Sequence, residues 1–394
     1  MIEVDSSPAS ALDRRRGAAP LRALFVNENI GGHATVHQAL RRCLTLRDDV
    51  RAEFVDVPDP GLLGRLARLP VPVLARQDLD LQPLRAQLAR SLWVRRKLAA
   101  RLRSAEVDVV HIYTQNCALA SSGLLRQVPS VVTTDSTTEL NAYRIPYRSP
   151  TRFTPWSVRA SIPLERRVLD AADRVVANSG FVAESLRSTY GIAEAKLSVL
   201  PFGVWLPPPP PPRPYRRPTI AFVGHQLERK GGLRLLQIHQ RELRERCDLL
   251  LVTTERVPNL PGVRVVSDLK GGSDRLWGLL QQADIMCFPS IIDQAPNAVL
   301  EGAAAGLPVV AHPVAAISEM VKHGVTGLLV PAGDDAALLA ALNALIDDPV
   351  RRRDMGRRAR EHMERHYDMR SAAEHLVTVL RTAAEHPCDD SASR

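Results

Sequence analysis

Twelve short apolar runs, rich in Val and Ile, alternate with helix-like segments along most of the chain. Six lie in the first half, at 21–27, 51–57, 108–113, 130–134, 173–177 and 197–201, and six in the second, at 219–224, 248–253, 263–266, 284–289, 308–311 and 327–330. Continuous apolar strands that alternate with helices are typical of parallel sheets covered on both faces. The pattern predicts an α/β protein with two facing Rossmann-like domains, whose ligands bind beyond the carboxyl ends of the strands.

Six consecutive prolines, 207–212, separate the two halves. Proline fits neither a helix interior nor a central strand, so this run predicts an extended, semi-rigid spacer. We therefore divide the chain into a disordered tail at 1–20, a first domain at 21–204, a linker at 205–217, a second domain at 218–368, a helix at 369–386 and a tail at 387–394.

Composition excludes several classes of protein. The chain is 45% hydrophobic and 24% charged, as in soluble globular proteins, and it has no run of 18 apolar residues that would predict a membrane span. Its first 20 residues lack the apolar segment of a secretory signal. Five cysteines without CxxC spacing predict neither a disulfide framework nor a zinc site, and they favour a reducing cytoplasm.

The positive charge is concentrated in the first half. Residues 1–200 hold 28 Lys and Arg against 20 Asp and Glu, whereas the remainder holds 24 against 23. This excess could attract an anionic surface or an acidic substrate, or Arg could simply be the solubilising residue of this chain. The segment 141–167 mixes aromatic residues with Arg and could line an acceptor pocket or touch anionic lipid at the inner membrane face. The basic segment 92–103 is better explained by packing on a sheet, and no nucleic-acid recognition motif is present, so we expect no nucleic-acid partner.

The stretch DQAPNAVLEGAAAGLPVV, 293–310, predicts a helix that begins near Pro296 and ends before Gly306. A helix N-terminus offers unpaired amides and partial positive charge, which suit a diphosphate. Asp293 precedes this helix and Glu301 lies one to two turns into it. The layout therefore fits a ligand with hydroxyls at both ends and a diphosphate between them, such as a nucleotide sugar. The alternative is a capping acid followed by an exposed helix glutamate.

Residues 288–334 resemble the donor-binding region of the family 4 glycosyltransferases, which have the two-domain GT-B fold and a C-terminal helix that returns to the first domain. The resemblance implies that Glu301 holds the ribose hydroxyls and that Asp293, where the family usually has Glu, holds those of the sugar. Other donor-binding positions that it implies in this region are Ala295, Pro296, Asn297 and Ala298.

The stretch TIAFVGHQLERKGG, 219–232, resembles the strand and basic motif of the same family. The resemblance implies that Lys230 contacts the donor phosphates and that the loop at Gly224 and His225 borders the donor. His225 stands where the family has arginine, and a neutral imidazole binds phosphate poorly at pH 7, so we expect Arg229 to supply the missing charge.

The first domain carries a looser resemblance. Gly31 and Gly32 follow the first predicted strand and resemble the Gly-Gly loop of the family, while the absence of GxGxxG argues against a dinucleotide oxidoreductase. Thr134 or Asp135 stands where the family often has a histidine near the transferred sugar. Asp135 could bind sugar or acceptor, or could cap the next segment. His111, placed at a strand end facing the cleft, could be functional or a buried core histidine.

The family resemblance implies a retaining, hexosyltransferase-type enzyme that moves a sugar from a UDP, GDP, ADP or dTDP sugar to a hydroxyl of a small molecule, natural product or lipid-linked glycan. Lys230, Arg229, Asp293 and Glu301 would carry the reaction, with no metal required. Two alternatives stay open. One is a sugar-nucleotide epimerase or hydrolase on the same fold, and the other is a partner subunit with little or no activity.

Overall fold

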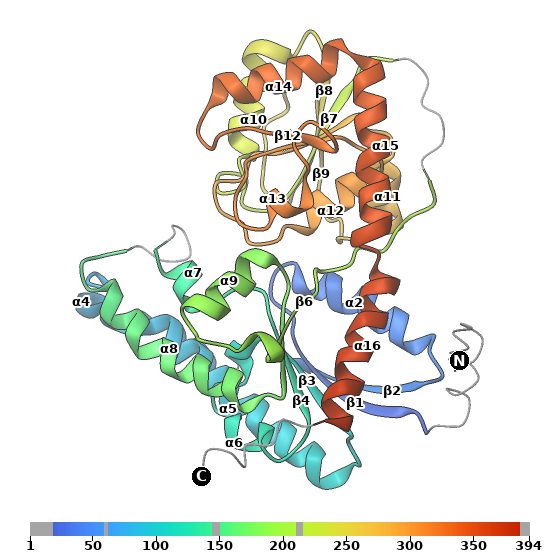
Figure 1. Ribbon diagram of the computed structural model, residues 1–394. Helices are drawn as coiled ribbons and strands as arrows, with labels where there is room; N and C mark the ends of the chain where they lie inside the picture. The colour runs from blue at the N-terminus through green and yellow to red at the C-terminus, as the bar shows by residue number, and fades with distance from the viewer. Residues whose placement is uncertain (1–18, 59–61, 144–149, 210–215, 387–394) are drawn as a thin grey trace, which may run out of the picture.

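The computed structural model describes residues 19–58, 62–143, 150–209 and 216–386 (Figure 1). The predicted tails therefore lie almost entirely outside the described residues, and so does the linker from 210 to 215. The same holds for 144–149 in the aromatic and basic segment considered as an acceptor or lipid contact.

All six apolar runs of the first half form strands of one parallel sheet, in the order β2-β1-β3-β4-β5-β6. The strands are β1 (Leu21–Glu28), β2 (Val50–Val57), β3 (Val109–Tyr113), β4 (Ser130–Thr134), β5 (Arg174–Ala177) and β6 (Leu197–Val199). The strand order reverses between β1 and β3, and a crevice outside the carboxyl ends is expected at that point. The loop after β1, which carries Gly31 and Gly32, therefore lies where ligands of such sheets bind.

Helices cover both faces of this sheet. On one face lie α2 (His33–Thr45) and the last helix of the chain, and on the other α5 (Gln82–Ser104), α8 (Thr154–Ala171) and α9 (Gly180–Ser188). Short elements complete the domain: α3 (Leu62–Arg68), α4 (Pro72–Ala75), η2 (Gln115–Cys117), α6 (Ser122–Leu125), α7 (Thr138–Ala142) and η3 (Glu194–Lys196). The side chains of Ser91, Val94 and Leu98 are buried, so α5 packs on the domain as its amphipathic pattern predicts.

The second half forms another six-stranded parallel sheet, in the order β12-β11-β10-β7-β8-β9. Its strands are β7 (Thr219–Val223), β8 (Asp248–Val252), β9 (Val263–Val266), β10 (Ile285–Phe288), β11 (Val309–Ala311) and β12 (Gly327–Leu329). Its helices are α10 (Gly232–Ile238), η4 (His239–Leu243), α11 (Asp274–Leu280), α12 (Asn297–Ala304), α13 (Ile317–Met320), α14 (Asp335–Asp347) and α15 (Pro349–His366). One apolar core unites them.

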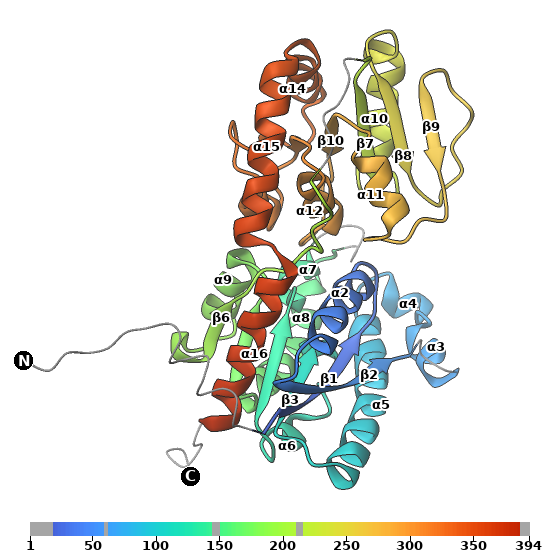
Figure 2. The same cartoon turned by 90° about the vertical axis from the view of Figure 1, so that its right-hand side faces the viewer.

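The last helix, α16 (Met369–Glu385), returns to the first domain (Figures 1 and 2). Leu376, Val377 and Leu380 join the core formed by α2 and the first sheet. Near the end of the helix, Arg381 donates to the Asp49 carboxylate at 3.0 Å. The chain thus crosses twice between two facing α/β domains, which confirms the predicted GT-B architecture.

Hydrogen bonds at three places in the described residues join the domains across the cleft. Gln294 Nε2 donates to Asn141 Oδ1 at 2.8 Å, and Asn297 Nδ2 donates to the carbonyl of Gly32 at 2.9 Å. The Glu319 carboxylate accepts the backbone N–H groups of Gly180 and Phe181, at 2.9 and 2.8 Å, and so caps the N-terminus of α9 from the opposite domain. Within the described residues, none of the helices combines the length and apolar character that crossing a bilayer requires.

Candidate active site

Glu301 lines a cavity between the domains. Its side chain is 3% exposed, and one carboxylate oxygen accepts the backbone N–H of Gly272 at 2.7 Å. Burial raises the pKa of Glu301 to about 7, although the Gly272 hydrogen bond and the charge of Lys230 act to lower it. Glu301 is therefore not the exposed helix glutamate of the alternative interpretation.

The cavity beside Glu301 has a volume of about 260 Å³ and is bounded by both domains. Its walls include Thr35 and Arg42 of α2, Trp205 of the linker and Trp277 of α11. The Arg42 guanidinium lies 4.0 Å from the centre of the Trp205 ring, which fixes this aromatic face beside the cavity. A pocket with aromatic walls and a buried carboxylate can accommodate a nucleoside, with the carboxylate accepting the ribose hydroxyls.

The N-terminus of α12 adjoins this cavity. The helix begins at Asn297, one position later than predicted, so Pro296 is its cap rather than its first residue. Gly306 follows the helix end with φ +78°, as expected of a glycine at that place. The first backbone N–H groups, those of Asn297 and Ala298, find no acceptor among the described residues. They are available to an anion.

Asp293 lies between two cationic side chains in the loop before α12. Ala295, two residues later in this loop, is half-buried. Its Oδ2 is 3.5 Å from Lys230 Nζ and 3.6 Å from Arg229 Nη1. Arg229 also donates to the carbonyl of Ile292 at 2.9 Å and to Gln226 Oε1 at 2.6 Å, so it braces the loop that carries Asp293. Among the described residues, Lys230 Nζ donates to no carbonyl, and its charge acts on the buried Glu301.

Three positions around Lys230 explain its placement. A Cβ at Gly224 would come within 2.8 Å of the Lys230 Cδ, so the glycine leaves room for the lysine stem. Gly231 has φ +79°, and a Cβ there would overlap the carbonyl of Pro289 at the end of β10. His225 turns to the neighbouring loop, where its Nδ1 lies 3.0 Å from Thr254 Oγ1. The sequence analysis did not identify Gly231 as a site residue, although the sequence Lys230-Gly231-Gly232 is typical of a tight turn.

The first-domain candidates separate into different roles. Thr134 is fully buried and donates to Gln115 Oε1 at 3.0 Å, which is a structural role. The expectation that His111 faces the cleft is wrong, because it lies in the middle of β3 and is 2% exposed. Its Nε2 meets Thr133 Oγ1 at 2.8 Å, and burial lowers its pKa to about 3. His111 is thus a buried core histidine.

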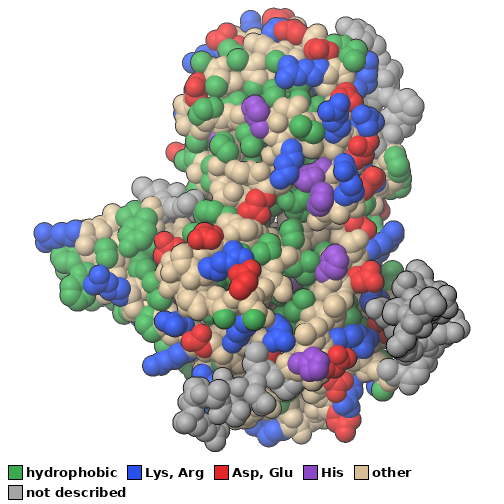
Figure 3. Space-filling model, in the orientation of Figure 1, with side chains coloured by type: hydrophobic (Ala, Val, Ile, Leu, Met, Phe, Trp, Pro, Cys, Tyr) green, Lys and Arg blue, Asp and Glu red, His purple; other side chains and the backbone are tan. Residues whose placement is uncertain are grey.

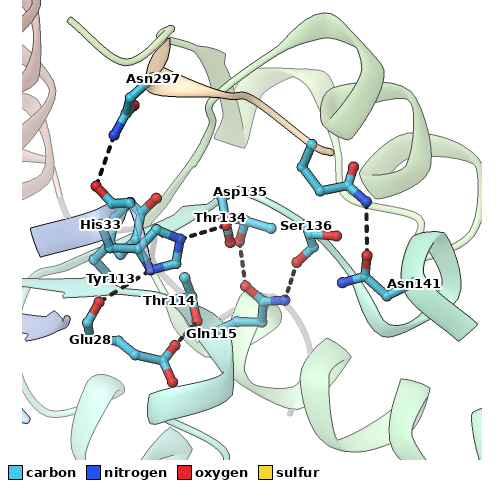
Figure 4. Close-up of polar contacts among 12 residues, drawn as sticks. Glu28, His33, Tyr113, Thr114, Gln115, Thr134, Asp135, Ser136, Asn141 and Asn297 are labelled. Atoms are coloured by element: carbon cyan, nitrogen blue, oxygen red, sulfur yellow. Dashed lines mark hydrogen bonds and ion pairs between the residues drawn. The ribbon is translucent and has the colours of Figure 1, made fainter. Parts of the chain in front are cut away.

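Asp135 lies in the cleft and pairs with a residue that the sequence did not reveal. His33 Nε2 lies 2.8 Å from Asp135 Oδ2, and each of the two side chains is 19% exposed (Figure 4). The loop between β1 and α2 brings His33 there. Gly31 in this loop has φ +55°, and a Cβ at Gly32 would come within 3.0 Å of Asn297 Nδ2. Glycine therefore allows this loop to approach α12 closely.

The described residues contain no cluster of three or more His, Cys, Asp or Glu side chains suited to a metal ion. The expectation that the reaction needs no metal stays a prediction.

Comparison with known proteins identifies the family. The family model described as "Glycosyltransferase Family 4" matches residues 30–207, and that described as "Glycosyl transferases group 1" matches residues 217–348. The chain belongs to the family 4 glycosyltransferases.

Two curated relatives illustrate the range of the similarity. The D-inositol 3-phosphate glycosyltransferase of Kribbella flavida is 29% identical over 252 residues, which are 56% of this chain and 59% of that protein. The chain thus spans less than two thirds of the length of that relative. The alpha-maltose-1-phosphate synthase of Mycolicibacterium smegmatis is 28% identical over 83% of this chain and 87% of its own length.

Solved structures share the fold. A sucrose-phosphate synthase from Thermosynechococcus elongatus superposes with a TM-score of 0.67 at 19% identity, covering 92% of this chain and 98% of its own. Anabaena HepE, solved in complex with UDP-glucose, gives a TM-score of 0.62 at 16% identity, covering 92% of this chain and all of its own.

Proposed function

We propose that the protein is a retaining glycosyltransferase that moves a sugar from a nucleotide diphosphate sugar to a hydroxyl acceptor. The observation that carries this proposal is the order of groups along the cleft. The buried Glu301 lies in the nucleoside-sized cavity, the free amides of Asn297 and Ala298 follow, and the Lys230–Asp293 pair lies beyond. A nucleoside, a diphosphate and a sugar fit these three positions in the same order.

The likeness to HepE, which binds UDP-glucose, supports a nucleotide sugar as donor. Within the chain, Glu301 would accept hydrogen bonds from the ribose, and Lys230 with the α12 amides would hold the diphosphate. Asp293 would accept from hydroxyls of the sugar, where Lys230 and Arg229 keep its charge compensated. We propose that these groups act without a metal ion.

The reaction would be a substitution on one face of the sugar. The bond from the anomeric carbon to the diphosphate oxygen breaks, the bond to the acceptor oxygen forms, and the acceptor proton passes to the leaving phosphate. No protein nucleophile is needed. The protein stabilises the negative charge that develops on the diphosphate, through Lys230 and the helix amides. Contacts across the cleft hold the two domains together and exclude water from the reacting atoms.

The first experiment is a thermal-shift screen against UDP-, GDP-, ADP- and dTDP-sugars. A ligand at about 100 times its Kd should stabilise the fold by roughly 2.7 kcal/mol, a shift of several degrees. Glu301→Ala should abolish the shift, whereas Glu374→Ala, at an exposed glutamate of α16, should preserve it. No shift with any of the four, in a folded sample, would contradict the proposal and favour a partner subunit.

A product assay then distinguishes the remaining alternatives. Release of nucleoside diphosphate that depends on a hydroxyl acceptor identifies a transferase, and the anomeric configuration of the product tests retention. Release or epimerisation that is equally fast without an acceptor would instead identify a hydrolase or an epimerase.

We also propose that the first domain contacts anionic lipid through one projecting surface, called here the tip surface. It consists of exposed apolar side chains with arginines among them: Leu66, Leu69, Val73, Leu74 and Trp156 with Arg65, Arg68, Arg76, Arg152 and Arg159. In the space-filling view it lies on the projection where Figure 1 places α4 and the start of α8 (Figure 3). Val73 is 77% exposed and Trp156 is 67% exposed.

Two hydrogen bonds hold the two segments of the tip surface side by side. Thr151 Oγ1 donates to the carbonyl of Gln77 at 2.7 Å, and Thr154 Oγ1 donates to the Asp78 carboxylate at 2.5 Å. In 65–80 and 150–160 the only acids are Asp78 and Asp80, and both are buried. Exposed apolar groups next to unopposed arginines are the combination that partitions to an anionic bilayer surface. A lipid-linked acceptor would then be reached from the membrane surface.

A further inference from the structure

His33 and Asp135 form a charged pair in the cleft that none of the assigned roles uses. They lie 102 positions apart in the sequence, at the first position of α2 and directly after β4. Both follow carboxyl ends of parallel strands, the edge at which such sheets bind ligands. The pair also adjoins the donor side, because Gly32, the residue before His33, accepts the hydrogen bond from Asn297.

The hydrogen bonds of His33 determine its protonation state. Its Nε2 lies 2.8 Å from a carboxylate oxygen of Asp135, and its Nδ1 lies 3.2 Å from the carbonyl oxygen of Glu28. A carboxylate and a carbonyl oxygen only accept, so the two contacts favour hydrogen on both ring nitrogens, which is the imidazolium form. Burial alone would lower the pKa of His33, but the charge and hydrogen bond of Asp135 and the charge of Glu28 raise it above its ordinary value.

The titratable groups around the pair come from four elements, β1, α5, β3 and α2. Glu28, at the end of β1, pairs with Arg90 of α5 and accepts from Thr114 Oγ1 at 2.8 Å. Tyr113 of β3 meets both His33 and His37 edge-on, with ring centres 4.9 and 4.6 Å apart. Burial lowers the pKa of His37 to about 3, so His37 stays neutral at pH 7. His33 is thus surrounded by Glu28, Tyr113 and Asp135, and it is as exposed as Asp135.

Among the described residues, no structural role explains an aspartate at position 135. The alternative that it caps the next helix is wrong, because Thr137 caps α7 by accepting the N–H of Leu140. Its Oδ2 is taken by His33, while its Oδ1 makes no hydrogen bond to any described residue. A carboxylate oxygen without a donor, partly exposed at the edge of the cleft, can accept a hydrogen bond from a ligand hydroxyl.

We propose that Asp135 binds the acceptor hydroxyl group and that the protonated His33 is the positioning residue that fixes its carboxylate. This inference rests on the proposed transferase function and names the acceptor side of that site. The group bound here is a hydroxyl rather than a phosphate, because a carboxylate accepts from hydroxyls and repels anions. The acceptor oxygen would thereby be oriented toward the anomeric carbon, at the junction with α12.

The first test reads the protonation of His33 directly and needs no substrate. Nitrogen-15 NMR of the histidine rings is followed against pH in the wild type, with His33→Gln used to assign the signals. We expect both His33 nitrogens to stay protonated through pH 7, and Asp135→Asn to make the ring lose its proton at lower pH than in the wild type. A neutral His33 at pH 7 in the wild type would overturn the proposal.

The second test separates acceptor from donor effects. Release of nucleoside diphosphate is measured with glucose, glucose 1-phosphate or D-inositol 3-phosphate as acceptor, and with water. Asp135→Asn should lower kcat/KM for the acceptor at least tenfold, whereas donor affinity should change less than twofold. His33→Gln should show a smaller loss and should remove the fall in rate that the wild type shows as pH rises through the pKa of His33.

The matched control is His37→Gln, one helical turn further along α2, which loses a histidine against the same tyrosine ring but not the Asp135 contact. It should change neither the pH profile nor the acceptor kinetics. An Asp135→Asn protein with normal acceptor kinetics and normal donor affinity would refute the role of the pair. Failure of the wild type to bind any donor would instead refute the proposed function.

Discussion

Asn297, at the first position of the donor-side helix α12, donates a hydrogen bond of 2.9 Å to the carbonyl of Gly32 in the opposite domain. The contact joins the two loops between which the diphosphate would lie. It is short because Gly32 lacks a Cβ, which would come within 3.0 Å of Asn297 Nδ2. A methyl group at residue 32 would therefore press on the Asn297 side chain that bridges the two domains.

We expect Gly32→Ala to hold the cleft open, and Asn297→Ala to relieve that effect. The added methyl group in Gly32→Ala displaces the Asn297 side chain, so turnover should fall roughly tenfold. In the Asn297→Ala background the same methyl group meets free space, so Gly32→Ala should lower turnover little further. A double-mutant cycle on kcat/KM measures this coupling.

Small-angle scattering of the Gly32→Ala protein should show a larger radius of gyration than that of the wild type. Gly123→Ala is the control, because a Cβ at Gly123 meets no atom within 4 Å. Additive effects of Gly32→Ala and Asn297→Ala, within about 0.5 kcal/mol, would show that the two residues do not set the closure.

Glu301 should make the ligand-free protein less stable as pH rises. Its pKa is about 7 in the folded state and 4.5 in the reference state. Between these values the folded state binds the extra proton, so stability falls from pH 4.5 to 7 and is level above. Glu301→Gln removes this loss while its amide oxygen can still accept from Gly272. The difference in free energy of unfolding between Glu301→Gln and the wild type should therefore be larger at pH 8 than at pH 4.5. The change in this difference, in favour of the variant, should be up to roughly 3 kcal/mol.

Thermal unfolding of both proteins at pH 5 and pH 8 measures this difference. The advantage of Glu301→Gln should appear at pH 8 and shrink at pH 5, whereas Glu374→Gln, at an exposed glutamate, should behave as the wild type at both. An advantage of the same size at both pH values would mean that Glu301 ionises normally.

Substitutions of Lys230 and of Arg229 should have different effects on rate and stability, although the two residues are adjacent in the sequence. Lys230→Met removes the charge nearest the diphosphate and should lower kcat/KM by a factor of about 10² or more, with little change in the unfolding temperature. Arg229→Met removes the donors to the Ile292 carbonyl and Gln226, so it should destabilise the loop that carries Asp293 and lower the unfolding temperature as well.

Thermal unfolding and steady-state kinetics on the two variants separate these roles, with Lys97→Met as a control at an exposed lysine of α5. An Arg229→Met protein of unchanged stability but severely reduced rate would make Arg229 a charge-stabilising residue, as the sequence alone suggested.

The strands and the donor motif could be predicted because their signals are local. Each buried parallel strand is a continuous apolar run, and all twelve were found. In the 293–306 stretch, Pro296 before the helix and Gly306 after it predict where the helix begins and ends. His111 was misjudged because the point at which a strand passes from core to cleft depends on its register with neighbouring strands.

The sequence predicted Asp135 as a candidate for sugar or acceptor binding, but its contact with His33 could not be predicted in the same way. The partner of His33 is Asp135, which is 102 positions away, and the partner of Glu301 is a backbone amide of Gly272 that no side-chain pattern reveals. Such contacts depend on how the loops at the strand ends converge, which a single sequence does not encode in any local pattern.

The tip surface should bind vesicles of mixed phosphatidylcholine and phosphatidylglycerol but not vesicles of phosphatidylcholine alone. Each arginine near an anionic bilayer contributes about 1 kcal/mol and is screened by salt, while Val73 and Trp156 supply the apolar contact. Co-sedimentation should therefore weaken from 0.05 to 0.5 M salt, and a Val73→Glu, Trp156→Glu double variant should lose it. Val350→Glu, at a residue of α15 that is 68% exposed, should bind as the wild type does. Equal binding to neutral vesicles, or a double variant that still sediments, would show that these side chains do not contact lipid, and a water-borne acceptor would then be favoured.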